Sequence, residues 1–187
     1  MDHDVVAAIE VLKSGGVILY PTDTIWGIGC DATNEAAIDR IYQLKRRTDT
    51  KSMLVLVDTL TRIEQYVQEI PEIAFQLLEV ADKPMTIIYP GARNLAKNLI
   101  GQDGSIGIRL VKDEFCVRLL SRIKRPLVST SANLSGQSSP LTYKDIVDEI
   151  KSGVDYVVKW RQNDHRSARP SSIVKVYVNG VIEILRK

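Results

Sequence analysis

GGVILYPTDTIWGIGCDA, residues 15–32, is the stretch that decides the predicted fold. It opens with a short apolar run at 17–20, bounded by two glycines and Pro21, which is typical of a buried strand. Thr22, Asp23 and Thr24 follow directly, at the end of a strand where ligands of α/β proteins usually bind. The alternative interpretation is an ordinary turn in which Asp23 caps the backbone.

The composition is that of a globular protein. The chain has 187 residues, 44% of them hydrophobic and 26% charged, so a single domain over 1–187 with a substantial core is expected. No apolar run reaches the ~18 residues that a membrane-spanning helix requires, and the N-terminus lacks the layout of a signal peptide. We therefore expect a cytoplasmic protein without membrane contact.

Metal and nucleophile chemistry have little support in the sequence. The cysteines, Cys30 and Cys116, lie in apolar surroundings and indicate no disulfide framework, and the histidines, His3 and His165, lack ligand spacing. His165 stays open as a spatial partner of a distant residue. The net charge of +2 is too small to identify a nucleic-acid-binding protein.

Helices and strands are expected to alternate along the chain. Apolar spacing predicts helices over 3–14, from Asn34 to 46, over 59–67, from Pro71 as first residue, over 115–123, and from a capping box at Thr142 and Asp145 to about 151. Strands are predicted at 17–20, 53–57, 85–89, 105–110, 126–130 and 155–159, before a hairpin of 172–178 and 181–186 with Asn179-Gly180 in a type I′ turn. This order predicts an α/β fold on a mixed sheet.

Three further polar segments lie at ends or on faces of these strands. Lys45, Arg46, Arg47 and Lys51 precede the strand at 53–57 and are suited to phosphate, although a solvated basic loop is the plainer interpretation.

The strand at 105–110 has Ser105 and Arg109 on its polar face, which suits either a cleft or an exposed surface. Ser131 and Asn133 belong to the hydroxyl-rich loop 129–140, for which a flexible loop is the alternative to an anion site. Together these segments predict a cleft for a phosphorylated, hydroxyl-rich ligand, although neither a P-loop nor a Rossmann glycine motif is present.

PTDT at 21–24, K-x-R at 45–47, SIGIRL at 105–110 and S-x-N at 131–133, in this order, resemble the YrdC-like family of threonylcarbamoyl-AMP synthases. The resemblance covers essentially the whole chain and implies an α/β fold with a twisted open mixed sheet, flanking helices and a basic cavity. It also implies a nucleotidyltransferase that converts L-threonine, bicarbonate and ATP into threonylcarbamoyl-AMP and pyrophosphate. The product would serve threonylcarbamoyladenosine synthesis in tRNA, with separate threonylcarbamoyl-transfer proteins as partners.

The same resemblance implies roles for individual residues. Threonine would be bound by Thr22, Thr24, Arg109, Ser131 and Ser171. ATP would be bound by Lys45, Arg47, Lys51, Ser105, Asn133 and Arg186. The catalytic residues would be Lys45, Arg47 and Arg109, which neutralise charge during phosphoryl transfer, while Mg²⁺ would be held by the ATP phosphates rather than by a protein metal site.

The chain departs from the family pattern at three positions. Thr48 stands in place of a proline, Leu56 in place of a histidine and Trp26 in place of a tyrosine. Leu56 would remove one polar contact, whereas Trp26 would keep an aromatic wall. Two other functions stay open: a non-catalytic module that binds tRNA or double-stranded RNA, and a carbamoyl-transfer domain like those of hydrogenase-maturation proteins.

Overall fold

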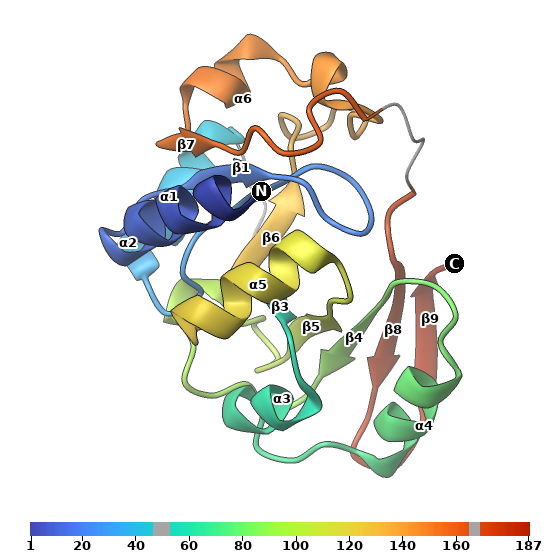
Figure 1. Cartoon of the computed structure of the whole chain (residues 1–187). Helices are drawn as coiled ribbons and strands as arrows, with labels where there is room; N and C mark the ends of the chain where they lie inside the picture. Colours follow the sequence, from blue (N-terminus) through green and yellow to red (C-terminus); the bar gives the residue numbers. More distant parts are fainter. Residues whose placement is uncertain (47–52, 165–168) are drawn as a thin grey trace.

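A twisted mixed sheet crosses the molecule from β7 to β9 (Figure 1). This computed structural model describes residues 1–46, 53–164 and 169–187. Within these residues the sheet has nine strands in the order β7-β1-β2-β6-β3-β5-β4-β8-β9. The strands are β1 (Ile18–Tyr20), β2 (Gly27–Gly29), β3 (Leu54–Val57), β4 (Met85–Tyr89), β5 (Ile106–Leu110), β6 (Leu127–Ser131), β7 (Tyr156–Val157), β8 (Ser172–Val176) and β9 (Ile182–Arg186).

Strand β6 lies between the two halves of the sheet and pairs with β2 along one edge and with β3 along the other. Its first residues, from Leu127 to Ser129, pair with β3, and Thr130 and Ser131 pair with β2, both antiparallel. The pairs β1–β7, β3–β5 and β4–β8 are parallel, so the sheet is mixed as predicted. Gly29 lies where β1, β2 and β6 meet, and a Cβ atom there would clash with the Val128 carbonyl oxygen and the Tyr20 ring.

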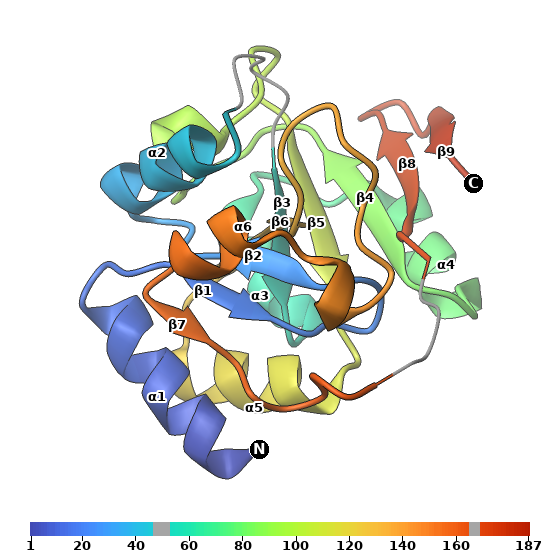
Figure 2. The same cartoon turned by 90° about the horizontal axis from the view of Figure 1, so that it is seen from above.

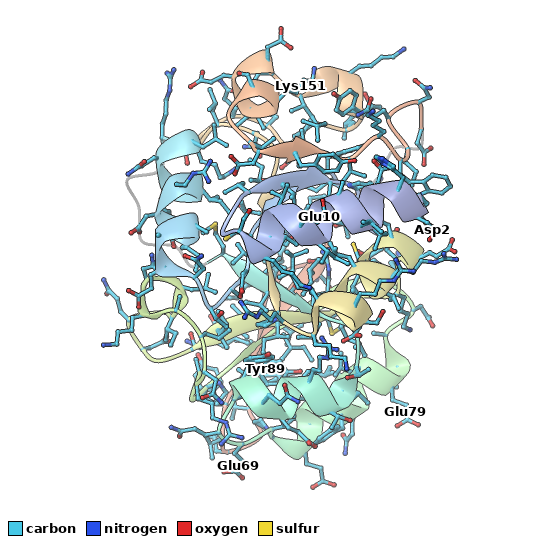
Figure 3. The ribbon with its side chains drawn as sticks, turned by 60° about the vertical axis from the view of Figure 1, so that its left-hand side comes forward. Asp2, Glu10, Glu69, Glu79, Tyr89 and Lys151 are labelled. Atoms are coloured by element: carbon cyan, nitrogen blue, oxygen red, sulfur yellow. The ribbon has the colours of Figure 1, made fainter. Side chains whose placement is uncertain are left out.

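Helices cover the two faces of the sheet unequally. On one face, α1 (Asp2–Lys13) and α5 (Glu114–Ile123) pack together and share a core cluster with Leu56 and Ile18. Figures 1 and 2 both show these helices side by side. The other cluster contains residues of α2 (Glu35–Leu44), α3 (Leu60–Tyr66) and α4 (Glu72–Val80), packed with Val55 and Ile108. Tyr89 lies fully buried in that cluster, whereas Glu69 and Glu79 lie at the outer edge of the molecule (Figure 3).

Side-chain caps begin two of the predicted helices, and the cap predicted at Asn34 is confirmed. Asn34 accepts a hydrogen bond from the Ala37 backbone N–H at 3.1 Å and begins α2. Asp113 accepts one from the Cys116 N–H at 3.0 Å and begins α5. Pro71 is the residue before α4 rather than its first residue.

The single helix predicted over 142–151 is wrong. The capping box of Thr142 and Asp145 is present, but it opens only a 3₁₀ turn, η2 (Tyr143–Asp145). Ile146 then adopts an extended conformation and buries its side chain in the core, leaving it 2% exposed. A short helix, α6 (Asp148–Ser152), follows. Burial of Ile146 therefore interrupts a helix that local sequence signals favour.

The hairpin of β8 and β9 is confirmed, but its predicted type I′ turn is wrong. Gly180 N–H donates to the Tyr177 carbonyl, and Tyr177 N–H donates to the Val181 carbonyl, both at 3.0 Å. Gly180 has a φ of 81°, whereas Asn179 is not among the described non-glycine residues with positive φ. The turn is therefore a three-residue loop with glycine in the left-handed position.

Strand β7 is shorter than the predicted strand at 155–159, because Asp4 draws the chain away from the sheet. Its carboxylate accepts the N–H groups of Lys159 and Trp160 at 3.0 and 3.1 Å, together with the Tyr156 hydroxyl at 2.7 Å. Separately, no helix of the described ranges is long and apolar enough to span a membrane.

Candidate functional site

Two adjoining cavities lie over the part of the sheet that α1 and α5 leave open. Cavity 1 has a volume of about 440 Å³ and cavity 2 about 610 Å³. They share the residues Thr24, Ile25, Trp26, Pro170 and Arg186. The segment around 21–26, predicted as the ligand-binding corner, thus forms the wall between them.

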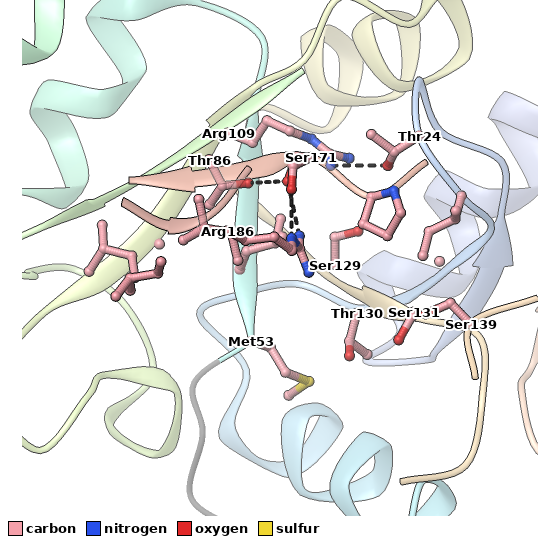
Figure 4. A pocket seen from close by; sticks show the side chains of 18 of the residues that line it. Thr24, Met53, Thr86, Arg109, Ser129, Thr130, Ser131, Ser139, Ser171 and Arg186 are labelled. Carbon is pink, nitrogen blue, oxygen red and sulfur yellow. Dashed lines mark hydrogen bonds between the residues drawn. The ribbon is translucent and has the colours of Figure 1, made fainter. Parts of the chain in front are cut away.

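Cavity 1 is lined by hydroxyl groups and two guanidinium groups (Figure 4). Its polar side chains are Thr24, Thr86, Ser105, Arg109, Ser129, Thr130, Ser131, Ser139, Ser171 and Arg186. None of its described lining residues is an aspartate or glutamate. Hydroxyls donate and accept hydrogen bonds and arginines hold anionic oxygens, so the lining suits an anionic ligand rich in oxygen.

Arg109, on β5, is a buried cation of the site, and two contacts hold its guanidinium group. Its side chain is 3% exposed, its Nη1 donates to Thr24 Oγ1 at 3.1 Å, and its Nη2 lies 3.1 Å from Asp23 Oδ1. The Thr22 hydroxyl donates to the Ile25 carbonyl at 2.8 Å, so the Thr24 hydroxyl is the donor in its 2.9 Å bond to Thr22. This chain of bonds fixes the hydroxyl and guanidinium groups relative to each other.

Asp23 is a carboxylate in an unfavourable environment. Burial raises its pKa, the neighbouring Asp113 raises it further, and the ion pair with Arg109 offsets part of that effect. The Asp23 side chain is 17% exposed and lines cavity 2.

Ser171 and Arg186 form the opposite wall of cavity 1. The Ser171 and Thr86 hydroxyls are 2.8 Å apart, and Arg186 Nε donates to the Ser171 carbonyl at 2.8 Å. Burial and the positive charge of Arg109 lower the pKa of Arg186. Two guanidinium groups that repel each other across a cavity favour an anion between them.

Trp26 provides the aromatic wall expected from the sequence. Its ring lines both cavities and is 5.0 Å from the Tyr143 ring, at 50°. Leu56, in contrast, does not line either cavity. It pairs with Arg109 across β3 and β5 but is fully buried in the core beneath α1 and α5.

Lys45 and Asn133 do not line the cavities either. Lys45 is 3% exposed, and its Nζ donates to the carbonyl groups of Ser131 and Asn133 at 2.5 Å each. Asn133 Nδ2 donates to the carbonyls of Leu134 and Gln137 at 2.9 and 2.8 Å. Both side chains therefore hold the loop that brings Ser131 to cavity 1, and their predicted contacts with ATP stay predictions.

Of the four remaining predicted residues, the structure describes Ser105 and Thr22. Ser105 lines cavity 1 and donates to Asp103 Oδ1 at 2.6 Å. Thr22 lines cavity 2, although its hydroxyl is bonded within the turn. Arg47 and Lys51 lie outside the described residues.

Several lining residues were missed from the sequence. Thr86 lies inside a strand whose apolar pattern was the stronger signal, whereas Ser129 and Ser139 belong to the stretch 129–140 that was predicted as a possible anion site. Lys83, Arg161 and Arg169 line cavity 2 and come from turns or a polar loop, where isolated cations carry no functional signal.

Comparisons with known proteins identify the family of this chain. The family model of Sua5, YciO and YrdC, described as "Telomere recombination", matches residues 10–187. A protein of Pseudoalteromonas translucida named threonylcarbamoyl-AMP synthase is 34% identical over 157 residues, which are 82% of this chain and 84% of that protein.

Solved structures share the fold at lower identity. E. coli YciO has a TM-score of 0.86 at 22% identity, over 100% of this chain and 90% of YciO. P. abyssi Sua5 complexed with L-threonine has a TM-score of 0.80 at 22% identity, over 92% of this chain. The chain spans only 50% of that Sua5 chain. The match of the family model and the identity to the synthase both reach across most of the sequence, and this chain belongs to the Sua5/YciO/YrdC family.

Proposed function

We propose that this chain is an L-threonylcarbamoyladenylate synthase, a nucleotidyltransferase that forms threonylcarbamoyl-AMP and pyrophosphate from L-threonine, bicarbonate and ATP. The observation that carries the proposal is the Arg109–Thr24 pair in a cavity lined by hydroxyls. The 34% identity to a protein named threonylcarbamoyl-AMP synthase supports it. So does the fold shared with P. abyssi Sua5, whose structure contains L-threonine.

In this proposal threonine occupies the end of cavity 1 near Thr24. Arg109 binds its carboxylate, Ser171 binds its polar groups from the opposite wall, and Thr22 fixes the Thr24 hydroxyl. ATP extends toward Ser105 and Ser131 and away from cavity 2. Arg186, close to both parts, would hold a phosphate oxygen.

The chemistry asks for positioning and charge neutralisation. The amine of threonine and bicarbonate form a carbamate, one carbamate oxygen forms a bond to the α-phosphorus of ATP, and the bond from that phosphorus to pyrophosphate breaks. Negative charge builds on the transferring phosphoryl group and on the leaving pyrophosphate. Arg109 and Arg186 are placed to neutralise such charge, and Lys45, Arg47, Lys51 and Asn133 remain proposed contributors.

Mg²⁺ fits this site as an ion bound to the phosphates of ATP. The polar lining of cavity 1 offers hydroxyl oxygens and, among its described residues, no carboxylate, a donor set too weak to hold Mg²⁺ by itself. The ion would be held by ATP phosphates, with Ser105 or Ser131 able to contribute a hydroxyl oxygen. When bound, the ion would neutralise negative charge on the phosphates.

The product would be used in tRNA modification. A mixed anhydride of a carbamate and a phosphate hydrolyses readily, so it must pass quickly to proteins that transfer the threonylcarbamoyl group to tRNA. Those transfer proteins, and tRNA itself, are the partners that we propose.

Turnover of purified protein with ATP, Mg²⁺, bicarbonate and L-threonine tests the proposal. We expect pyrophosphate release that falls to background when threonine is omitted, and an adenylate detected by mass spectrometry. The alternative, an RNA-binding module, would give salt-dependent binding of tRNA or double-stranded RNA without any threonine-dependent pyrophosphate. That result would overturn the proposed function.

A further inference from the structure

The proposed reaction releases one proton that none of the predicted residues accepts. Threonine enters as an ammonium ion, and its nitrogen must lose a proton before it can attack bicarbonate. In the balanced step, ammonium and bicarbonate give a carbamate, water and one proton. A group that takes this proton must be basic and must lie close to where the amine is held.

Few described residues meet that requirement. The described lining of cavity 1 contains no aspartate, glutamate or histidine. That of cavity 2 contains two carboxylate side chains, those of Asp23 and Asp164. Asp164 Oδ2 lies 3.4 Å from Arg161 Nε, in the polar segment after β7, whereas Asp23 directly precedes Thr24 in the chain and lies against Arg109. Asp23 is therefore the carboxylate next to the proposed threonine site.

Asp23 and Arg109 lie close enough together for one amino acid to contact both. Asp23 Oδ1 is 3.1 Å from Arg109 Nη2. In a free amino acid the nitrogen and the carboxylate carbon are about 2.5 Å apart, from standard backbone dimensions. A threonine whose carboxylate meets Arg109 can thus turn its nitrogen toward Asp23. The Arg109 guanidinium, the threonine carboxylate, the threonine ammonium and the Asp23 carboxylate then alternate in charge, which is favourable.

The two oxygens of Asp23 are in different surroundings. Oδ1 is buried beside Arg109, with no hydrogen bond of good geometry, so the 17% exposure of the side chain comes from its other atoms. The side chain lines cavity 2, which adjoins cavity 1 at Thr24. Cavity 2 therefore offers a route between the Asp23 carboxylate and solvent.

We propose that Asp23 is a catalytic residue that accepts the proton of threonine's amine during carbamate formation. The nitrogen–carbon bond forms, the bond from carbon to the bicarbonate hydroxyl breaks, and that hydroxyl takes one nitrogen proton and leaves as water. The other ammonium proton goes to Asp23, which becomes a neutral carboxylic acid and returns the proton to solvent through cavity 2. The inference rests on the proposed function and adds the base that it lacks.

Burial makes Asp23 a better base than an exposed aspartate. Burial and Asp113 raise its pKa, and Arg109 lowers it. The groups around it are Arg109 on β5, Asp113 and Cys116 at the start of α5, and Arg161 after β7, whose Nη1 is paired with Asp113. A higher pKa of the Asp23 carboxyl group lies nearer to the pKa of the amine, which eases proton transfer between them.

The test compares Asp23→Asn with the wild-type protein over pH. Asparagine keeps the shape and an oxygen that can accept from Arg109, but it cannot take the proton. At about pH 7 we expect kcat to fall about 100-fold, as for loss of a general base. At about pH 9.5 the gap should shrink below about tenfold, because more threonine is then already deprotonated. Bicarbonate speciation changes equally for both proteins and cancels in the ratio.

Two further variants and two measurements complete the design. Asp164→Asn removes the other carboxylate of cavity 2 and should keep the wild-type pH profile. Asp23→Glu keeps a base and should recover at least a tenth of the kcat. Melting curves and threonine binding by calorimetry report whether the fold and the site survive in each variant.

Each outcome decides the inference separately from the proposed function. A loss in Asp23→Asn that is the same at every pH would make Asp23 a positioning residue for Arg109 and overturn the inference. Undiminished turnover would overturn it as well. If Asp23→Asn fails to fold, an Asp23→Glu variant that folds but stays inactive at all pH values would contradict it. The proposed function itself fails only if the wild-type protein shows no threonine-dependent turnover.

Discussion

Lys45 is a buried cation that binds carbonyl oxygens of a loop. Its Nζ donates to Ser131 and Asn133, and its own carbonyl accepts the Ser135 N–H at 2.9 Å. These bonds connect the end of α2 to the loop after β6. The position of Ser131 in cavity 1 therefore depends on a side chain that does not line the cavity.

Lys45→Met tests this supporting role. Methionine keeps most of the apolar stem but leaves two carbonyl groups without their donor, which costs about 1–3 kcal/mol for each buried group left unpaired. We expect unfolding free energy to fall by about 2 kcal/mol in urea titrations. The exposed Lys144→Met is the matched control and should change stability little. Unchanged stability in Lys45→Met would show that these bonds contribute nothing net.

Residues of the site differ in how far the sequence reveals them. Thr24 and Arg109 were predictable because they follow a strand or alternate with its apolar residues, so their side chains meet at one cleft. Lys45 shares a motif with Arg47, but no pattern in a sequence tells whether a cation faces a ligand or a carbonyl group. Thr86 was hidden because one hydroxyl within an apolar strand is usually a packing feature.

At the scale of elements, one ion pair ties the turn before β5 to β8. Asp103 Oδ2 lies 2.7 Å from Lys175 Nζ, and Asp103 Oδ1 accepts the Ser105 hydroxyl. The hydrogen bond from Lys175, followed by that from Ser105, lowers the pKa of Asp103 to about 2. Because Ser105 lines cavity 1, this pair also fixes one of the hydroxyls of the site.

The ion pair of Asp103 and Lys175 makes the stability of the folded protein depend on pH. Since the pKa of Asp103 is lower in the folded protein, its contribution is present above the ordinary aspartate pKa and is lost as pH falls toward about 2. We expect Asp103→Asn to unfold at lower urea concentration than wild type at about pH 7 and to match it near pH 2. Asp148→Asn, which removes a fully exposed partner of Lys151, is the control. A difference of equal size at both pH values would contradict the assignment.

Most elements could be predicted because local pattern and burial agree. The strand at 85–89 coincides with β4, and the cap at Asn34 begins α2. The helix over 142–151 failed because Ile146 is buried in the tertiary structure, and burial outweighs helix propensity. The strand at 155–159 ended early because of Asp4, a partner more than 150 residues away that no local pattern reveals.

At the scale of the whole molecule, the site exists because one face of the sheet is only partly covered. α1 and α5 bury Leu56, while Leu54, two residues earlier on the same strand, lines cavity 1. The sequence indicated a mixed α/β sheet, but not that β6 lies between β2 and β3 and so joins its halves. Strand order depends on contacts between distant segments, so periodicity alone does not specify it.

The most direct test of the account is the mass of the adenylate formed from ¹³C-bicarbonate, ATP and L-threonine by the wild-type protein and by Arg109→Met. Methionine keeps an unbranched apolar stem like that of arginine but cannot bind a carboxylate or donate to Thr24. We expect wild type to give threonylcarbamoyl-AMP one mass unit heavier than the unlabelled product, and the variant to give at least about 100-fold less. An unlabelled or absent adenylate with wild type, or full activity of Arg109→Met, would contradict the account.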